Sequence, residues 1–135
     1  MAEISQQEQQ EVLDIVTGFY KQRVDSEEEV NKLLQNLGAM VQQQGAKLVH
    51  INQTVFMVLV QGEGLVDFYA MYDKFNKQEQ IKNLKQFVAY AKNIGIKTLI
   101  TQTLPEDEYE EVLDDSGYKF QVEGEEDVNV FTLKV

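Results

Sequence analysis

Residues 54–72 read TVFMVLVQGEGLVDFYAMY. Two runs rich in β-branched and aromatic residues, 54–60 and 65–72, flank a turn that contains two glycines, which is the pattern of a β-hairpin. The first run is apolar on both faces, so both faces should be buried. A third run, 47–51, precedes the hairpin across a two-residue turn. The sequence therefore predicts a three-stranded antiparallel meander that is covered by helices on at least one side.

Helical periodicity flanks this meander. Three helix starts are predicted from a small polar cap that is followed three residues later by a glutamate: Ser5 with Glu8, Ser26 with Glu29, and Asn76 with Glu79. Apolar residues recur on one face after each cap, so each helix should dock by one side. Gly45 and Gly95 fit left-handed caps at the ends of the second and third helices.

The remaining segments complete a mixed fold. A buried strand is expected at residues 96–100, a fourth and acidic helix from Pro105, and a final hairpin of residues 118–123 and 128–135. The order is helix, helix, three strands, helix, strand, helix, two strands. This predicts an α+β fold with a central, mostly antiparallel mixed sheet and helices packed on its faces. No linker or repeat interrupts the chain, so we expect one domain over residues 1–135.

The core is predicted from the apolar helical stripes and the strands. It comprises Val30, Leu33, Leu37, Phe56, Val58, Val60, Phe68, Leu84, Phe87, Val88, Leu99, Ile100 and Phe131.

Composition and charge narrow the function classes. The chain has no cysteine and one histidine, so neither a thiolate site nor a histidine cluster for a metal is expected. A formal net charge of −11 repels phosphate backbones and anionic membranes, so we expect no nucleic-acid partner and no membrane partner. The same charge favours a cationic amine substrate or a basic protein partner. No apolar run is long enough for a membrane span, and the predicted location is the cytoplasm.

The element order, together with the passage EDEYEEVLDDSGYKF at residues 106–120, resembles the GCN5-related N-acetyltransferase (GNAT) superfamily of acyl-CoA N-acyltransferases. The likeness covers about residues 26–135, and the family's first strand has no clear counterpart. The resemblance implies a sheet whose fourth and fifth family strands splay apart to hold acyl-CoA. Because members of the family often pair through their C-terminal strands, the resemblance also implies a homodimer through these strands, residues 128–135 included.

The sequence departs from the family pattern at the loop that binds the pyrophosphate of CoA. Members carry Q/R-x-x-G-x-G/A between the fourth strand and the third helix, whereas residues 72–87 read YDKFNKQEQIKNLKQF without a glycine. Glycines let backbone amides approach a pyrophosphate, so acetyl-CoA is expected to bind weakly. The residues left to hold the cofactor are Tyr72 and two point charges beside the start of the third helix, Lys74 and Lys77.

The resemblance gives two candidate catalytic residues, Tyr109 and Asp67. The family tyrosine that protonates the departing thiolate falls at Leu113, and Tyr109 lies one helical turn earlier on the same face. The family asparagine falls near Glu106. Asp67 lies where many members keep a general base, and partial burial would raise its pKa toward neutrality. His50 is expected to be a surface residue.

Two functions remain open at this point. The first is a divergent acyl-CoA-dependent N-acyltransferase or an inactive relative of one. The second is a non-catalytic acidic interaction or accessory protein, for which a bacteriophage origin and a place in the virion are one hypothesis.

Overall fold

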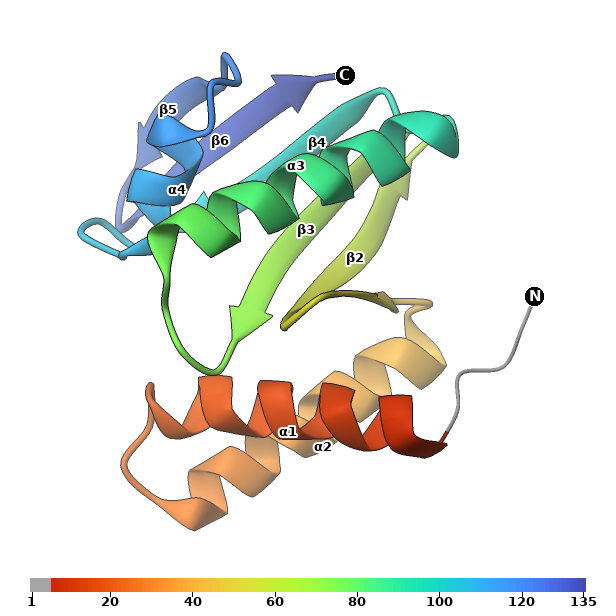
Figure 1. Ribbon diagram of the computed structural model, residues 1–135, viewed down its shortest axis with the longest axis vertical. Coiled ribbons are helices and arrows are strands. Elements are labelled where there is room, and N and C mark those ends of the chain that lie inside the picture. Colours follow the sequence, from red (N-terminus) through yellow and green to blue (C-terminus); the bar gives the residue numbers. More distant parts are fainter. Residues whose placement is uncertain (1–5) are drawn as a thin grey trace.

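The computed structural model describes residues 6–135 and confirms the predicted element order (Figure 1). The elements are α1 Gln6–Lys21, α2 Glu27–Gln43, β1 Lys47–Ile51, β2 Thr54–Gly62, β3 Leu65–Tyr72, α3 Lys77–Asn93, β4 Thr98–Thr103, α4 Tyr109–Asp115, β5 Gln121–Glu125 and β6 Val128–Lys134. The six strands form one sheet in the order β1-β2-β3-β4-β6-β5. Neighbouring strands are antiparallel except β3 and β4, which are parallel.

Two of the three predicted helix caps are confirmed. The backbone N–H of Glu29 donates to Ser26 Oγ at 3.1 Å, and that of Glu79 donates to Asn76 Oδ1 at 3.0 Å. These bonds satisfy amides that a helix start otherwise leaves without partners. Ser5 lies outside the described residues. Gly95, with φ of +90°, ends α3 in the left-handed region that glycine adopts without strain.

The main core lies between the sheet and helices α3 and α4. Phe87 of α3 stacks on Phe56 of β2 with ring centroids 4.3 Å apart, and it also contacts Phe68 of β3 at 5.2 Å. All three rings are buried, as predicted. Val60 was placed in the core by the sequence pattern, and this is wrong: its exposed fraction is 68%. Val60 pairs with Val66, and the register becomes irregular directly after it, between Val60 and Gly62, so Val60 lies at the end of the regular β2–β3 pairing.

Helices α1 and α2 pack on the opposite face of the β1–β3 half of the sheet, where Val16, Leu37, Val55 and Met71 form a second buried cluster. The end of α1 also contacts the loop of residues 73–76, which links β3 to α3. The side-chain amide of Gln22 donates to the Asp73 carbonyl. A Cβ on Gly18 would clash with the exposed side chain of Asp73, which would have to turn away.

Several features differ from the prediction. The first strand of the final hairpin covers Gln121–Glu125 rather than 118–123. The fourth strand covers 98–103 rather than 96–100, because the N–H of Ile96 still bonds to Ala91 O in the helix cap. The fourth helix begins at Tyr109, not at Pro105, because the chain turns at Glu106 with φ of +73°. The free edge at the C-terminal side is β5, whereas β6 lies between β4 and β5. Among the described residues, no helix is long and apolar enough to cross a membrane.

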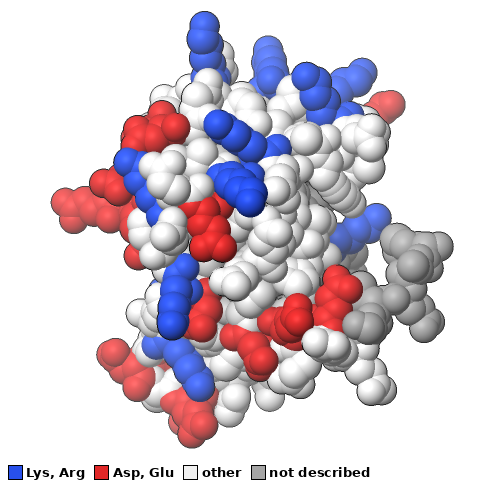
Figure 2. All heavy atoms as spheres, viewed as in Figure 1, with Lys and Arg blue, Asp and Glu red and all other residues white. Residues whose placement is uncertain are grey.

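Charge is unevenly distributed over the surface. On the face shown in Figure 2, lysines gather over the upper part, where α3 lies, whereas carboxylates lie along the left side and across the lower part along α1, together with some basic side chains at the lower left. Helix α3 carries Lys77, Lys82, Lys85 and Lys92.

Candidate functional site

The sheet opens between its two parallel strands. β3 and β4 pair through three residues each, from Leu65 with Thr98 to Asp67 with Ile100. Beyond Asp67, β3 continues to Tyr72 alongside β2, and β4 continues to Thr103 alongside β6. The facing edges of the two strands therefore have no strand partner beyond that pair in the described chain. This is the splay that the sequence resemblance implied.

A pocket of about 240 Å³ lies in this splay, and we call it the β3–β4 pocket. It is lined by residues 69–72 of β3, residues 101–103 of β4, Phe19, Tyr20, Arg23, Met57, Asp107 and Tyr109. Four consecutive strand residues point alternately to the two faces of a sheet. The pocket is therefore bordered by both faces of β3, and it connects the α1 side of the sheet with the α4 side.

Tyr109 is the first residue of α4 and is predicted as catalytic. It lines the β3–β4 pocket, its exposed fraction is 6%, and its buried hydroxyl has no hydrogen-bond partner within residues 6–135. Burial raises the pKa of Tyr109 above its ordinary value of 10.0, and nearby Tyr72 raises it further. The hydroxyl therefore keeps its proton at neutral pH and is a buried donor without an acceptor.

Tyr72, at the end of β3, stacks against Tyr109 with ring centroids 6.1 Å apart. Its hydroxyl donates to Glu108 Oε2 at 3.2 Å. Burial raises the pKa of Tyr72, the charge of Glu108 raises it further, and a hydrogen bond from Arg23 opposes the rise. The sequence assigned Tyr72 to cofactor binding, and the structure places it in the wall of the β3–β4 pocket.

Asp67 lies at the closed end of the splay, opposite Ile100, on the sheet face that α1 and α2 cover elsewhere. It is half-buried, and Gln61 Nε2 donates to its Oδ2 at 2.7 Å. Burial raises the pKa of the Asp67 carboxyl, and the bond from Gln61 opposes the rise. Asp67 does not line the β3–β4 pocket itself. Of the two predicted catalytic residues, Asp67 thus lies on the α1 side of the sheet and Tyr109 on the α4 side.

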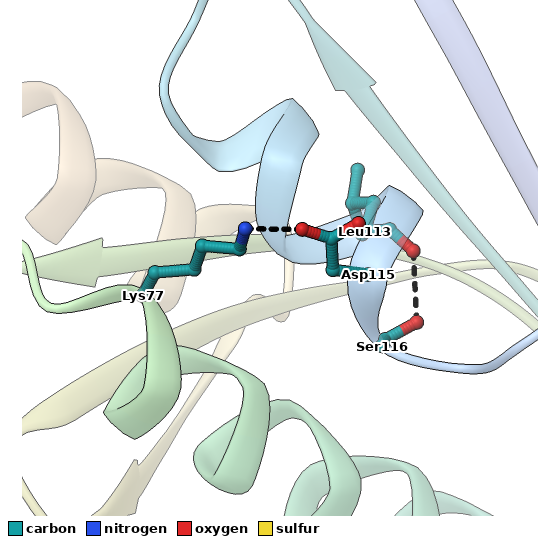
Figure 3. Close-up of polar contacts among 4 residues, drawn as sticks. All are labelled: Lys77, Leu113, Asp115 and Ser116. Carbon is teal, nitrogen blue, oxygen red and sulfur yellow. Dashed lines mark hydrogen bonds and ion pairs between the residues drawn. The ribbon is translucent and has the colours of Figure 1, made fainter.

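The lysines predicted to hold phosphates lie apart from this pocket. Lys77, the first residue of α3, forms an ion pair with Asp115 at the end of α4 (Figure 3). The hydrogen bond that Lys77 donates to Asp115 raises the pKa of Lys77. Lys74 is exposed and lines a separate depression together with Asp73 and Glu79. Lys77 is thus engaged by a carboxylate, whereas Lys74 has no ion pair within residues 6–135.

Two features of this region differ from the expectation or were missed. His50 was expected at the surface, but its side chain is only 14% exposed, with Nδ1 3.6 Å from Glu8 Oε1. It lies in a depression between α1 and α3, away from the splay. Arg23 lines the β3–β4 pocket and had no role in the sequence prediction. The sequence feature that could have pointed to Arg23 is that it is the single arginine of the chain.

Comparison with known proteins gives a result for structure and none for sequence. No protein-family model matches the sequence, and no curated protein matches it. The PaiA N-acetyltransferase of Thermoplasma acidophilum in complex with coenzyme A matches with a TM-score of 0.65 and 11% identity, over 99% of this chain and 97% of that one.

Two further solved structures match over nearly the whole chain. The N-acetyltransferase PseH of Campylobacter jejuni in complex with acetyl coenzyme A has a TM-score of 0.65 and 14% identity, with 98% of this chain and 93% of that one covered. An acetyltransferase of the GNAT family from Staphylococcus aureus has a TM-score of 0.60 and 13% identity, with 98% and 96% covered. The chain spans only 63% and 57% of two other matching structures. At such low identities these structural matches establish a likeness of architecture alone. On that basis the chain has the GNAT fold of the acyl-CoA N-acyltransferases.

Proposed function

We propose that this protein is an acyl-CoA-dependent N-acyltransferase that transfers a short acyl group, such as acetyl, to an amine. The observation that carries the proposal is the β3–β4 pocket, because it lies where two parallel strands part and contains a buried tyrosine hydroxyl that has no hydrogen-bond partner among residues 6–135. Solved structures of this fold include complexes with coenzyme A and acetyl coenzyme A.

The pocket fits the thioester end of the donor in two respects. The orphaned Tyr109 hydroxyl is a donor that needs an acceptor, and the sulfur or carbonyl oxygen of a thioester is one. The edge of β3 beyond Asp67 faces β4 without a strand partner in the described chain. An unpaired strand edge binds amide groups as a further strand would, and the pantetheine arm of CoA carries two amides.

The residues then have separate tasks. Bound acyl-CoA supplies an activated acyl group whose carbonyl carbon is attacked by the acceptor nitrogen, with a new C–N bond replacing the C–S bond. Tyr109 donates its hydroxyl proton toward the departing sulfur. Asp67, whose pKa burial raises, takes the proton that the amine loses, and it reaches that proton through water because it lies outside the pocket.

The phosphate end fits less well. The loop of residues 73–76 has no glycine, and α1 holds it through Gln22 and Asp73. One amide of the first turn of α3 already bonds to Asn76, and Lys77 is engaged by Asp115. Acyl-CoA must compete with these contacts for its phosphate site, so we expect a dissociation constant near or above the millimolar range.

Binding and turnover are tested separately. Calorimetric titration with acetyl-CoA measures binding, and a thiol reagent measures CoA release without background because the chain has no cysteine. Tyr109→Phe should still bind acetyl-CoA, less tightly than the wild type because the bond to the thioester is lost, and its kcat should fall by about 10²- to 10⁴-fold with a panel of primary amines. Tyr90→Phe, on the exposed side of α3, is the matched control and should keep its turnover. Absence of any acetyl-CoA binding at 10 mM ligand would refute the proposal.

The ion pair at the start of α3 gives a second test. Asp115→Asn releases Lys77 and should tighten acetyl-CoA binding more than Asp114→Asn does. Both variants change the net charge equally, so the difference between them isolates the ion pair. Equal effects would place the phosphates elsewhere.

A second candidate is a non-catalytic acidic interaction protein, acting in the cytoplasm or, if phage-encoded, in the virion. The engaged Lys77 favours it, because a phosphate site that is already filled by a carboxylate is what an inactive relative would show. Acetyl-CoA binding without release of CoA for any amine, together with capture of a basic protein partner, would support this candidate over the first.

A further inference from the structure

We propose that Arg23 binds an anionic group of the acceptor, so that the acceptor is an amine that also carries a carboxylate, as an α-amino acid does. The inference rests on the proposed acyl transfer and deepens it by naming the chemistry of the second substrate. The position of Arg23, its contacts and its charge environment lead to it.

Arg23 is held over the β3–β4 pocket by aromatic rings. Its Cζ lies 3.6 Å from the centroid of the Phe19 ring and 5.6 Å from that of Tyr72, and its Nη1 donates to Phe19 O at 3.3 Å. Stacking uses the flat face of a guanidinium and leaves N–H groups at its edge. Arg23 also donates a hydrogen bond to Tyr72. The ring contacts therefore fix the orientation of Arg23, and the N–H donors that Phe19 O and Tyr72 do not use stay available.

The charge of Arg23 is not neutralised by an ion pair. Within residues 6–135, no carboxylate lies within ion-pair distance of it. Arg23 borders a shallow depression together with three acidic residues of the facing loop, Glu106, Asp107 and Glu108. Two of them make other bonds: Asp107 Oδ1 accepts from the Tyr109 N–H at 2.8 Å, and Glu108 Oε2 accepts from the Tyr72 hydroxyl. A guanidinium that borders a pocket and lacks a carboxylate partner is a natural receptor for one, because its fork matches the two oxygens.

The anion at Arg23 belongs to the acceptor rather than to the phosphates of CoA. No described residue of α3 lines the β3–β4 pocket, whereas the helix start that suits a pyrophosphate is that of α3. A pocket of about 240 Å³ is also small for a nucleotide. A simple anion is disfavoured by the net charge of −11, but an amino acid carries a compensating ammonium group.

The single arginine makes a direct binding test possible. Phenylglyoxal modifies guanidinium groups, so intact-mass spectrometry of the full chain reports on Arg23 alone, with Arg23→Lys as the blank. We expect L-phenylalanine, L-methionine and L-lysine to protect Arg23. Phenethylamine, 3-(methylthio)propylamine and cadaverine, which lack only the carboxylate, should not. Equal protection by the two sets, or protection by neither, would overturn the inference.

Turnover gives the second readout. For an accepted amino acid, Arg23→Gln should raise KM by about ten- to hundredfold, the loss expected for hydrogen bonds to a charged group, with little change in kcat. For the matching amine, KM should stay unchanged. Arg23→Lys should fall between wild type and Arg23→Gln, because it keeps the charge without the fork. Lys21→Gln removes a nearby exposed cation and should leave both substrates unaffected.

The outcomes separate this inference from the proposed function. If acetyl-CoA binds and amines are acylated, but Arg23→Gln weakens acetyl-CoA binding or affects both acceptor sets alike, the inference fails and the function stands. If acetyl-CoA does not bind at all, the function fails, and selective protection of Arg23 by amino acids still supports a carboxylate receptor there.

Discussion

Replacing Tyr109 by phenylalanine should stabilise the folded protein in the absence of ligands. The hydroxyl is buried without a hydrogen-bond partner in the described chain, whereas in the unfolded chain it is hydrated. Mutational data place the cost of burying such a group without a partner at about 1–3 kcal/mol. Removing only the oxygen keeps the ring and its stacking on Tyr72. For a domain of this length each kcal/mol corresponds to about 3–5 °C in Tm.

The neighbouring Tyr72 gives a contrast within the same ring stack. Its hydroxyl donates to Glu108 Oε2, so Tyr72→Phe should lose about 0.5–1.5 kcal/mol, the net value of a typical hydrogen bond. Urea titrations of wild type and both variants should therefore move the midpoint in opposite directions at an unchanged slope. If Tyr109→Phe is as destabilising as Tyr72→Phe, the Tyr109 hydroxyl has an acceptor in solution and is not free to donate to the thioester.

Three other predictions concern stability. Phe87→Ala, which removes the ring stacked on Phe56, should cost about 3–5 kcal/mol in urea titrations, and a loss near zero would contradict the packing described. Asn83 is buried and donates to Thr54 Oγ1 at 2.8 Å, so Asn83→Ala should cost about 1–3 kcal/mol, and a neutral result would mean that water replaces the amide. Burial raises the pKa of Tyr109 above 10.0, so folding opposes ionisation of its hydroxyl. The stability that this gives is retained below pH 10 and falls as the pH rises beyond it. In melting curves between pH 9 and 11, Tyr109→Phe should show a smaller fall than the wild type.

The sequence predicted the element order because periodicity and caps are local signals, as at Asn76. The start of α4 was misplaced because Pro105 suits a helix start and a turn equally, and nothing local shows that Glu106 adopts a positive φ. Tyr109 was identified through a resemblance, but its lack of a partner depends on packing between α4 and β3. The role of Arg23 could not be predicted, because its neighbour Tyr72 is 49 residues away in the chain and is brought near by tertiary structure.

The contact between α1 and the loop of residues 73–76 has a thermodynamic consequence. The C-terminal end of α1 carries Phe19, which borders the β3–β4 pocket, and Gln22, directly after the helix, donates to the Asp73 carbonyl. A ligand that draws the loop away from α1 must break that contact and shift the equilibrium position of the pocket wall. Linkage then requires reciprocity: if a phosphate group at the loop lowers the affinity of the pocket for its ligand, that ligand lowers the affinity for the phosphate by the same factor. Gln22→Ala would uncouple the two, and paired titrations would measure the factor directly.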